Sequence, residues 1–252
     1  MLDNFLPSTD PMQLALLGGV FLLAGTVKGF LGIGLPAAAM ALLTLFLPPT
    51  EAIPLLWLPI VATNFLQFQR TPDKARIARE YWLFAVLIAA SIFATAMFIA
   101  SYPTALLTVT IGVAMVVFSL NLLLGIKLNI GPGKVWHLAF GLISGVLGGM
   151  SSIWSPPVAM YLVARNVPKE VFIGATGFLF LAGSVPLGLG QVVAGILTVP
   201  VLLKSLIGLG VVLVGYQIGE FLRHRVSQRY FRTAVLVAFL LMGLRLIVIG
   251  LV

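Results

Sequence analysis

The sequence contains no cysteine, only two histidines, and few charged residues, which make up 9% of its 252 residues. The absence of cysteine excludes disulfides, thiolate metal sites and haem attachment, and no cysteine–histidine pair can act as a nucleophile. Paired carboxylates, a phosphate-binding loop and a nucleophile elbow are missing too. We therefore expect no enzyme activity, no cofactor and no metal.

Hydrophobic residues dominate the composition. They account for 60% of the chain, and the mean hydropathy is +1.14, so polar residues are too few to cover a soluble domain. A membrane-spanning helix needs about 20 residues, which allows at most about ten passes and leaves nothing for a soluble domain. The sequence predicts an all-α membrane protein with up to ten transmembrane segments.

Proline and glycine divide the hydrophobic runs into ten helical segments. Two of them, residues 37–47 and 157–164, reach only about 16 and 12 Å, against about 30 Å of hydrocarbon. Each is predicted to be a half-helix that follows a helix break, at residues 31–36 and 148–156. The pattern leaves open whether the half-helices are re-entrant or belong to full crossings.

The two breaks are copies within an internal repeat. The matches are Gly25, Gly29 and Gly32 with Gly141, Gly145 and Gly148 at a shift of 116 residues, and Pro36, Met40 and Pro48 with Pro156, Met160 and Pro168 at a shift of 120. We predict two five-segment repeats, residues 1–127 and 135–252, joined by a linker at 128–134.

The distribution of positive charge indicates that the repeats are inverted. Residues 70–80 carry four Lys or Arg while the equivalent residues 190–200 have no Arg or Lys; residues 220–232 carry four while 101–103 have none. Cytoplasmic loops are enriched in Lys and Arg, so equivalent loops are expected on opposite sides of the membrane. Both termini then lie outside. The same rule explains the excess of basic residues, so we expect the lipid bilayer and no nucleic acid as a partner.

Inverted repeats with broken helices predict a binding site near the bilayer midplane. Backbone groups left free at a break must face protein, water or a ligand, and half-helix N-termini favour anions. The alternative is a pair of packing kinks without a ligand. The candidate substrate-binding residues are Lys28, Gly32, Gly34, Leu35, Pro36, Asn64, Gln67, Gly148, Gly149, Ser151, Ser152, Trp154, Ser155, Pro156, Ser184 and Arg245.

Several candidates have structural alternatives. Lys28 either faces an anion or extends to the inner headgroups, and Arg245 either lines the bundle or extends outward. Asn64 and Gln67 could simply bond neighbouring helices. Ser155, which precedes two prolines, is expected to cap the second half-helix.

The two break motifs resemble those of the TauE/SafE sulfite exporter family, also called TSUP. They read AGTVKGFLGIGLPAAAM at residues 24–40 and SGVLGGMSSIWSPPVAM at 144–160, and the resemblance covers nearly the whole chain. It implies transport, typically export, of sulfite, an organosulfonate such as sulfoacetate or another small anion across the inner membrane of a prokaryote.

The leading hypothesis is therefore a secondary transporter of a small, sulfur-containing anion that binds between the two half-helix N-termini. A passive anion channel and an importer of another small organic anion are the alternatives. The sequence does not choose between a proton and a sodium ion for coupling, and it does not define the exact substrate, the direction of transport or the oligomeric state.

Overall fold

The computed structural model describes residues 11–252 except 126–133, 224 and 226, and every regular element in these residues is a helix. The predicted linker at 128–134 lies outside the described residues apart from Lys134, which begins a helix. The elements are α1 (Pro11–Leu31), α2 (Leu35–Leu43), α3 (Pro49–Leu55), α4 (Trp57–Gln69), α5 (Lys74–Ala96), the 3-10 helix η2 (Ile99–Ser101), α6 (Thr104–Leu124), α7 (Lys134–Ser151), α8 (Ser155–Ala164), α9 (Lys169–Val193), α10 (Val199–Arg223) and α11 (Gln228–Leu251).

The chain is an integral membrane protein. Seven stretches of the described residues are long and apolar enough to cross a membrane: α1, α3 with α4, α5, α6, α9, α10 and α11. The ten expected segments are all present as helices when α3 and α4 count as one, but α2, α7 and α8 are too short to qualify.

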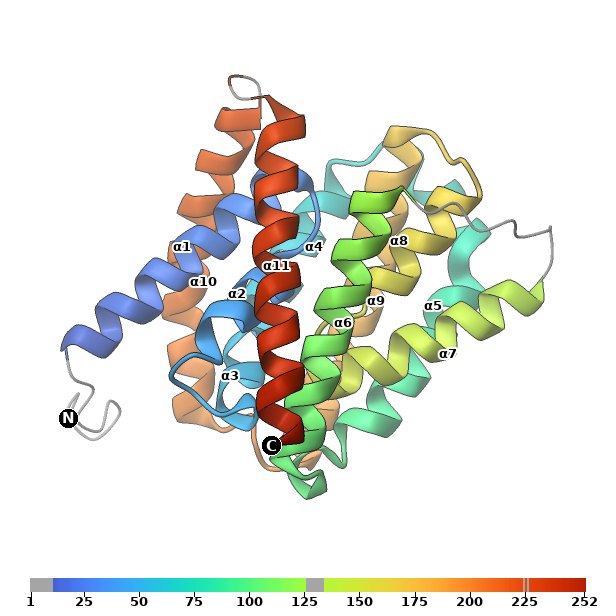
Figure 1. Ribbon diagram of the computed structural model, residues 1–252. Coiled ribbons are helices and arrows are strands. Elements are labelled where there is room, and N and C mark those ends of the chain that lie inside the picture. Colours follow the sequence, from blue (N-terminus) through green and yellow to red (C-terminus); the bar gives the residue numbers. More distant parts are fainter. Residues whose placement is uncertain (1–10, 126–133, 224, 226) are drawn as a thin grey trace.

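Each expected break produces two helices that meet at an angle. In Figure 1, α1 rises from the lower left and α2 turns back downward, whereas α7 descends toward the centre and α8 turns back upward. Both pairs thus have the shape of a re-entrant hairpin, and the two hairpins point in opposite directions. An inverted duplication requires this arrangement, while the division into two repeats stays a prediction.

The span formed by α3 and α4 is bent, and a side chain from another helix compensates for the bend. Pro59 has no N–H for the carbonyl oxygen of Leu55, four residues earlier. Ser205 of α10 donates its hydroxyl to that oxygen at 2.8 Å and accepts from the N–H of Leu58 at 3.2 Å. The bend is therefore stable because its free backbone groups find partners within the bundle.

Close packing of α1 on α10 fixes the position of the first break in the bundle. A Cβ atom at Gly25 or Gly29 would come within 2.3 or 2.1 Å of a backbone oxygen of α10, and one at Gly215 or Gly219 within 2.2 Å of α1. Only glycine permits this approach, as at small-residue interfaces of other membrane helices. The contact holds the C-terminal half of α1 against α10.

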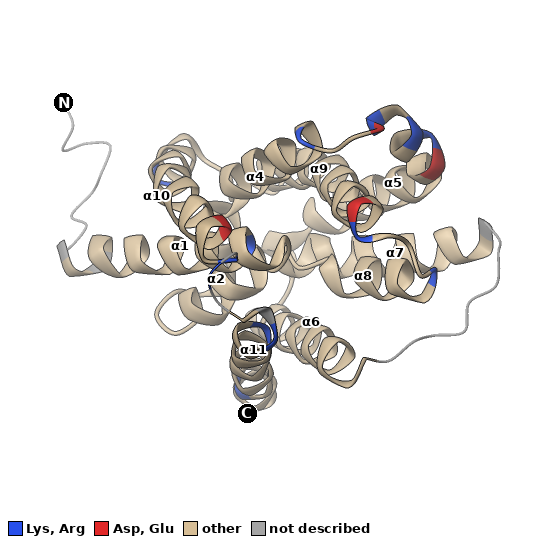
Figure 2. Cartoon of the chain, turned by 90° about the horizontal axis from the view of Figure 1, so that it is seen from above, with Lys and Arg blue, Asp and Glu red and all other residues tan. Residues whose placement is uncertain are grey.

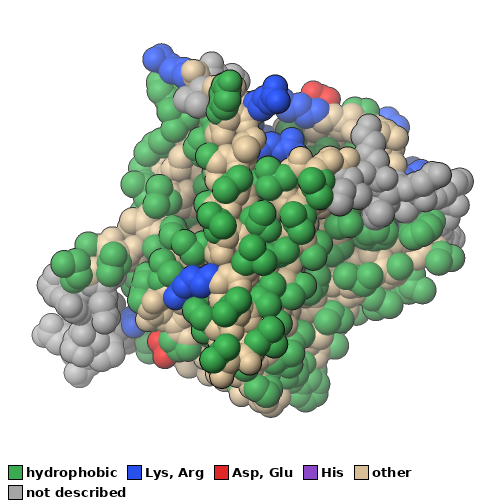
Figure 3. All heavy atoms as spheres, viewed as in Figure 1, with side chains coloured by type: hydrophobic (Ala, Val, Ile, Leu, Met, Phe, Trp, Pro, Cys, Tyr) green, Lys and Arg blue, Asp and Glu red, His purple; other side chains and the backbone are tan. Residues whose placement is uncertain are grey.

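Positive charge gathers at one end of the molecule. Figure 2 looks down on that end and shows Lys and Arg on the α4–α5, α8–α9 and α10–α11 connections. Hydrophobic side chains cover most of the face in Figure 3, over α6, α7 and α11. We call the charged end, at the top of Figure 1, the basic end; the last residues of α11 lie at the opposite end.

Candidate functional site

The first break consists of the three residues between α1 and α2. Gly32 and Gly34 have φ angles of +80° and +95°, in the left-handed region that glycine alone enters without strain. The chain can therefore reverse direction between Leu31 and Leu35. Pro36 follows in the first turn of α2, where its missing N–H costs no helical hydrogen bond.

An arginine satisfies the carbonyl groups that the first break leaves free. Arg223, the last residue of α10, donates from Nε to the oxygen of Phe30 at 2.9 Å and from Nη2 to the oxygen of Gly29. A positive charge at a helix C-terminus also interacts favourably with the helix dipole. Arg223 therefore holds the end of α1 at the basic end of α10.

The second break differs in its backbone and its side chains. Here Ser152, with a φ of +59°, occupies the left-handed conformation. Ser151 donates its hydroxyl to the oxygen of Leu147 at 2.5 Å and accepts from the N–H of Ile153 at 3.1 Å. The expectation that Ser155 caps α8 is wrong, because α8 already begins at Ser155 and the capping position is Trp154.

Lys28 is buried in the protein interior. Its side chain is 2% exposed, and Nζ donates to Oδ1 of Asn64 on α4 at 2.7 Å. The same Nζ lies 5.7 Å from the ring centre of Phe180 on α9, where it can interact with the π face. Lys28 therefore does not extend to the headgroups. The alternative of a snorkelling lysine is wrong because its amine is bonded within the bundle.

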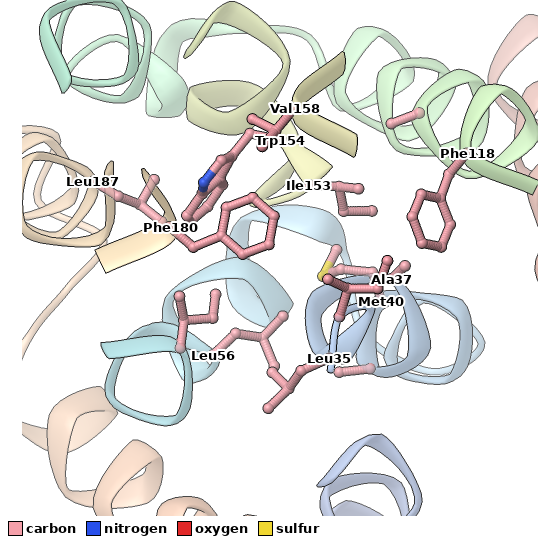
Figure 4. Packing of buried hydrophobic residues seen from close by; sticks show 14 of the residues in the cluster. Leu35, Ala37, Met40, Leu56, Phe118, Ile153, Trp154, Val158, Phe180 and Leu187 are labelled. Carbon is pink, nitrogen blue, oxygen red and sulfur yellow. The ribbon is translucent and has the colours of Figure 1, made fainter. Parts of the chain in front are cut away.

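A small cavity, which we call the inner cavity, lies between the two breaks. Its volume is about 20 Å³, room for about one water molecule. The residues that line it are Lys28, Gly34, Leu35, Pro36, Ile60, Thr63, Asn64, Ser152, Trp154, Ser155 and Phe180. Figure 4 shows the rings of Trp154 and Phe180 next to each other, with Leu35 of α2 across from them. Those two rings meet edge to face at a centroid distance of 5.8 Å.

Two residues that line the inner cavity have buried donors without partners. The hydroxyl of Ser152 and the indole N–H of Trp154 make no hydrogen bond within the described residues, although the side chains are 0% and 2% exposed. Unpaired buried donors are costly, and those found in native structures call for a specific explanation. A hydrogen-bond acceptor bound between the breaks would explain why these donors have no partner in the protein.

A larger cavity, which we call the vestibule, opens at the basic end. It has a volume of about 450 Å³ and reaches from the ends of α4, α10 and α11 down to the first break, where Phe30, Gly32 and Ile33 line it. Its charged lining residues are Arg70, Lys169, Glu170, Glu220, Arg223 and Arg232. The vestibule and the inner cavity therefore lie on either side of the segment from Gly32 to Gly34.

The sixteen candidate residues divide into three groups. Eight line the inner cavity: Lys28, Gly34, Leu35, Pro36, Asn64, Ser152, Trp154 and Ser155. Two line the vestibule: Gly32 and Gln67. The other six line neither cavity: Gly148, Gly149, Ser151, Pro156, Ser184 and Arg245.

The residues outside the cavities have identifiable structural surroundings. A Cβ at Gly148 would meet Trp154 at 2.9 Å, and one at Gly149 would meet Thr95, so both glycines serve close packing. The hydroxyl of Ser184 donates to the oxygen of Leu181 at 2.8 Å. Arg245 is exposed on α11. Ser184 and Arg245 therefore line neither cavity, and their assignment to the binding site stays a prediction.

Sequence reasoning missed three residues of the inner cavity: Ile60, Thr63 and Phe180. A signal for two of them was present, because Ile60 and Phe180 align at the same 120-residue shift that relates the prolines of the two breaks.

Sequence reasoning also missed the role of Arg223. The positive-inside rule treats an arginine in a cytoplasmic connection as a marker of topology and does not predict which carbonyl groups it bonds.

Fold and site together define an all-α membrane protein whose helices are broken around a buried lysine. The family model of the sulfite exporter TauE/SafE matches residues 17–246, and the chain belongs to this family. The protein is thus a membrane transporter of sulfur-containing anions such as sulfite. Neither the curated proteins nor the solved structures compared with the chain produced a match.

Proposed function

We propose that the protein is a secondary exporter of sulfite or a small organosulfonate, which binds in the inner cavity between the N-termini of α2 and α8. The observation that carries this proposal is the surroundings of Lys28. Its buried amine faces an amide oxygen, and no described carboxylate lies within ion-pair distance of it. A buried cation without a counterion is costly, and an anion in the inner cavity would compensate it.

The vestibule supports cytoplasmic entry. It opens at the basic end, which the positive-inside rule assigns to the cytoplasm. On this assignment both termini lie outside, in the inner membrane of a prokaryote. Basic side chains at the rim raise the local concentration of anions. An anion that enters from the cytoplasm reaches the first break before it reaches Lys28.

The anion passes from the vestibule to the inner cavity by a local movement. The inner cavity, at about 20 Å³, is too small for sulfite as it stands, and the first break separates it from the vestibule. Because Gly32 and Gly34 lack side chains, this segment can change its backbone angles at low cost. Its displacement would widen the inner cavity and admit the anion, which favours a carrier over an open channel.

The test is uptake of labelled sulfite into proteoliposomes by wild type, Lys28→Met and Lys204→Met. Lys204 lies on α10 and lines neither cavity, so it is the matched control. We expect flux in wild type and Lys204→Met and at least a ten-fold loss in Lys28→Met, with all three proteins folded. Equal flux in the two variants would contradict the proposed site, and no flux of any anion would contradict the function.

The same vesicles separate a carrier from a channel. A carrier saturates and responds to an imposed proton or sodium gradient if either ion is coupled, whereas a channel passes currents far above carrier rates and ignores such gradients. We expect saturation and no channel currents, because no continuous opening joins the vestibule to the inner cavity.

A further inference from the structure

The inner cavity has few charged residues in its lining. Of the eleven described residues that line it, only Lys28 carries a charge. Its hydrogen-bond partner, Asn64, is neutral. The basic side chains at the rim belong to the vestibule, and Arg223 is bound to the carbonyl groups of α1. The interior site therefore offers at most one positive charge.

The two half-helices add less positive charge than their number suggests. The partial charge at a helix N-terminus resides on backbone N–H groups that have no helical partner. Prolines occupy early positions in both helices, Pro36 in α2 and Pro156 with Pro157 in α8, and proline has no N–H. The N-termini can therefore assist one negative charge without replacing a second cation.

The rest of the wall is poorly suited to a second charge. Ile60, Leu35 and Phe180 are apolar and almost fully buried. The hydroxyl of Thr63 is already bonded to the oxygen of Pro59 at 2.7 Å. A second negative charge would be removed from water without a second cation to compensate it, which is strongly unfavourable in an apolar interior.

The available donors suit a head group with three oxygen atoms. The ammonium of Lys28 has three N–H bonds and Asn64 accepts from one of them. Ser152 and Trp154 each contribute one donor that has no partner within the described residues. Lys28 and Ser152 belong to the two different halves, so the three donors that remain on them can give one hydrogen bond to each oxygen of an SO3 group between the breaks.

We propose that the inner cavity selects singly charged SO3 groups, hydrogensulfite or a monosulfonate, over doubly charged anions. The inference rests on the proposed transport function and narrows its substrate. Sulfite itself is then carried in its singly protonated form. Organosulfonates with a second acidic group, such as sulfoacetate, are poor substrates.

The first test compares the pH dependence of two anions in proteoliposomes. Hydrogensulfite loses its proton close to neutral pH, whereas methanesulfonate stays singly charged throughout. At a fixed, subsaturating total concentration, sulfite flux should fall about ten-fold per pH unit on the alkaline side of that transition, as the singly charged form does. Methanesulfonate flux measured in the same vesicles corrects for any titration of the protein. Equal pH profiles for the two anions would overturn the proposal.

The second test holds pH constant and varies the charge of the anion. Propanesulfonate and sulfoacetate are similar in size, but the second carries an additional carboxylate. As competitors of methanesulfonate flux, propanesulfonate should inhibit at least ten-fold more strongly. Thr63→Lys, which adds a cation to the wall, should reduce that ratio. If sulfoacetate competes equally well in wild type, the charge selection is refuted while transport stands; if methanesulfonate and sulfite show no flux, the proposed function fails instead.

Discussion

The two helix breaks differ in backbone conformation and in chemistry. At the 116-residue shift that aligns the glycines, Ser144 occupies the position equivalent to Lys28. Lys28 bonds Asn64, whereas the hydroxyl of Ser144 has no partner within the described residues. The first break supplies the charge and the second supplies the neutral donors Ser152 and Trp154. The proposed anion site therefore draws on both halves.

The two ends of the molecule differ as well. At the basic end, the vestibule reaches inward to the first break. Below the second break, α7 packs tightly on α5: a Cβ at Gly145 would lie 1.9 Å from Oγ of Ser91, and one at Gly149 would lie 1.8 Å from Oγ1 of Thr95. The vestibule therefore opens the first break toward the basic end, whereas the glycines of α7 leave no room between α7 and α5.

The largest effect is expected from moving the lysine between the breaks. Lys28→Ser should reduce anion binding at least ten-fold, because the cavity loses its only charge. Ser144→Lys added to it should not restore binding, since the residue aligned with Asn64 is Ser184, whose hydroxyl already donates to Leu181. The added Ser144→Lys substitution should also lower the free energy of unfolding by about 3 kcal/mol, because it places an unpaired charge in the interior.

Inhibition of labelled methanesulfonate flux by unlabelled anion reports the first effect, and thermal unfolding in detergent reports the second. The single variant Ser144→Ala is the control, and it should leave binding unchanged and be slightly stabilising, because it removes an unpaired hydroxyl. Recovery of binding in the Lys28→Ser/Ser144→Lys protein would mean that the breaks are interchangeable and that the comparison is wrong.

A second variant addresses the cap of the first break. Arg223→Gln should lower the free energy of unfolding by about 2 kcal/mol, because two charge-assisted hydrogen bonds to α1 are lost. Arg232→Gln is the matched control: it removes the same charge from the vestibule, but its bond to the oxygen of Leu122 is exposed. Equal loss of stability in the two variants would show that the cap contributes nothing special.

Much of this architecture was predictable from the sequence. The breaks at 31–36 and 148–156 are marked by glycine and proline, and their short half-helices follow from length alone. Eight of the sixteen candidate residues line the inner cavity, and six of these eight belong to the breaks themselves. Local patterns of this kind report where a helix stops, since only certain residues permit it.

The remaining residues depend on tertiary contacts that no local pattern encodes. The pairing of Lys28 with Asn64 requires α1 and α4 to lie together, and the capping role of Arg223 requires α10 to end beside α1. The two alternatives for Arg245 stayed open for the same reason: its depth in the membrane follows from the sequence, but the face of α11 that it occupies depends on how α11 packs on α6.

Smaller and opposite effects are expected at two of the left-handed positions in the breaks, Gly34 and Ser152. Gly34→Ala should destabilise the protein by about 1 kcal/mol through the backbone alone, because a Cβ there would lie 3.6 Å from its nearest neighbour. Ser152→Gly should stabilise it by a similar amount while it weakens anion binding, since the hydroxyl is lost. Thermal unfolding and methanesulfonate competition measure the two effects separately. Destabilisation by Ser152→Gly would show that its backbone is not strained.

The smallest effect should come from the ion pair at the vestibule. Arg70 and Glu220 are joined at 2.9 Å, with side chains 59% and 33% exposed. Solvent screens such a pair, so Glu220→Gln should change the free energy of unfolding by less than about 1 kcal/mol. The variant leaves the vestibule with one more net positive charge, so anion entry should become faster at low salt, and the gain should vanish at high salt. Arg70→Gln should do the opposite. A large, salt-independent loss of stability in either variant would mean that charge at the vestibule acts as buried charge does at Lys28.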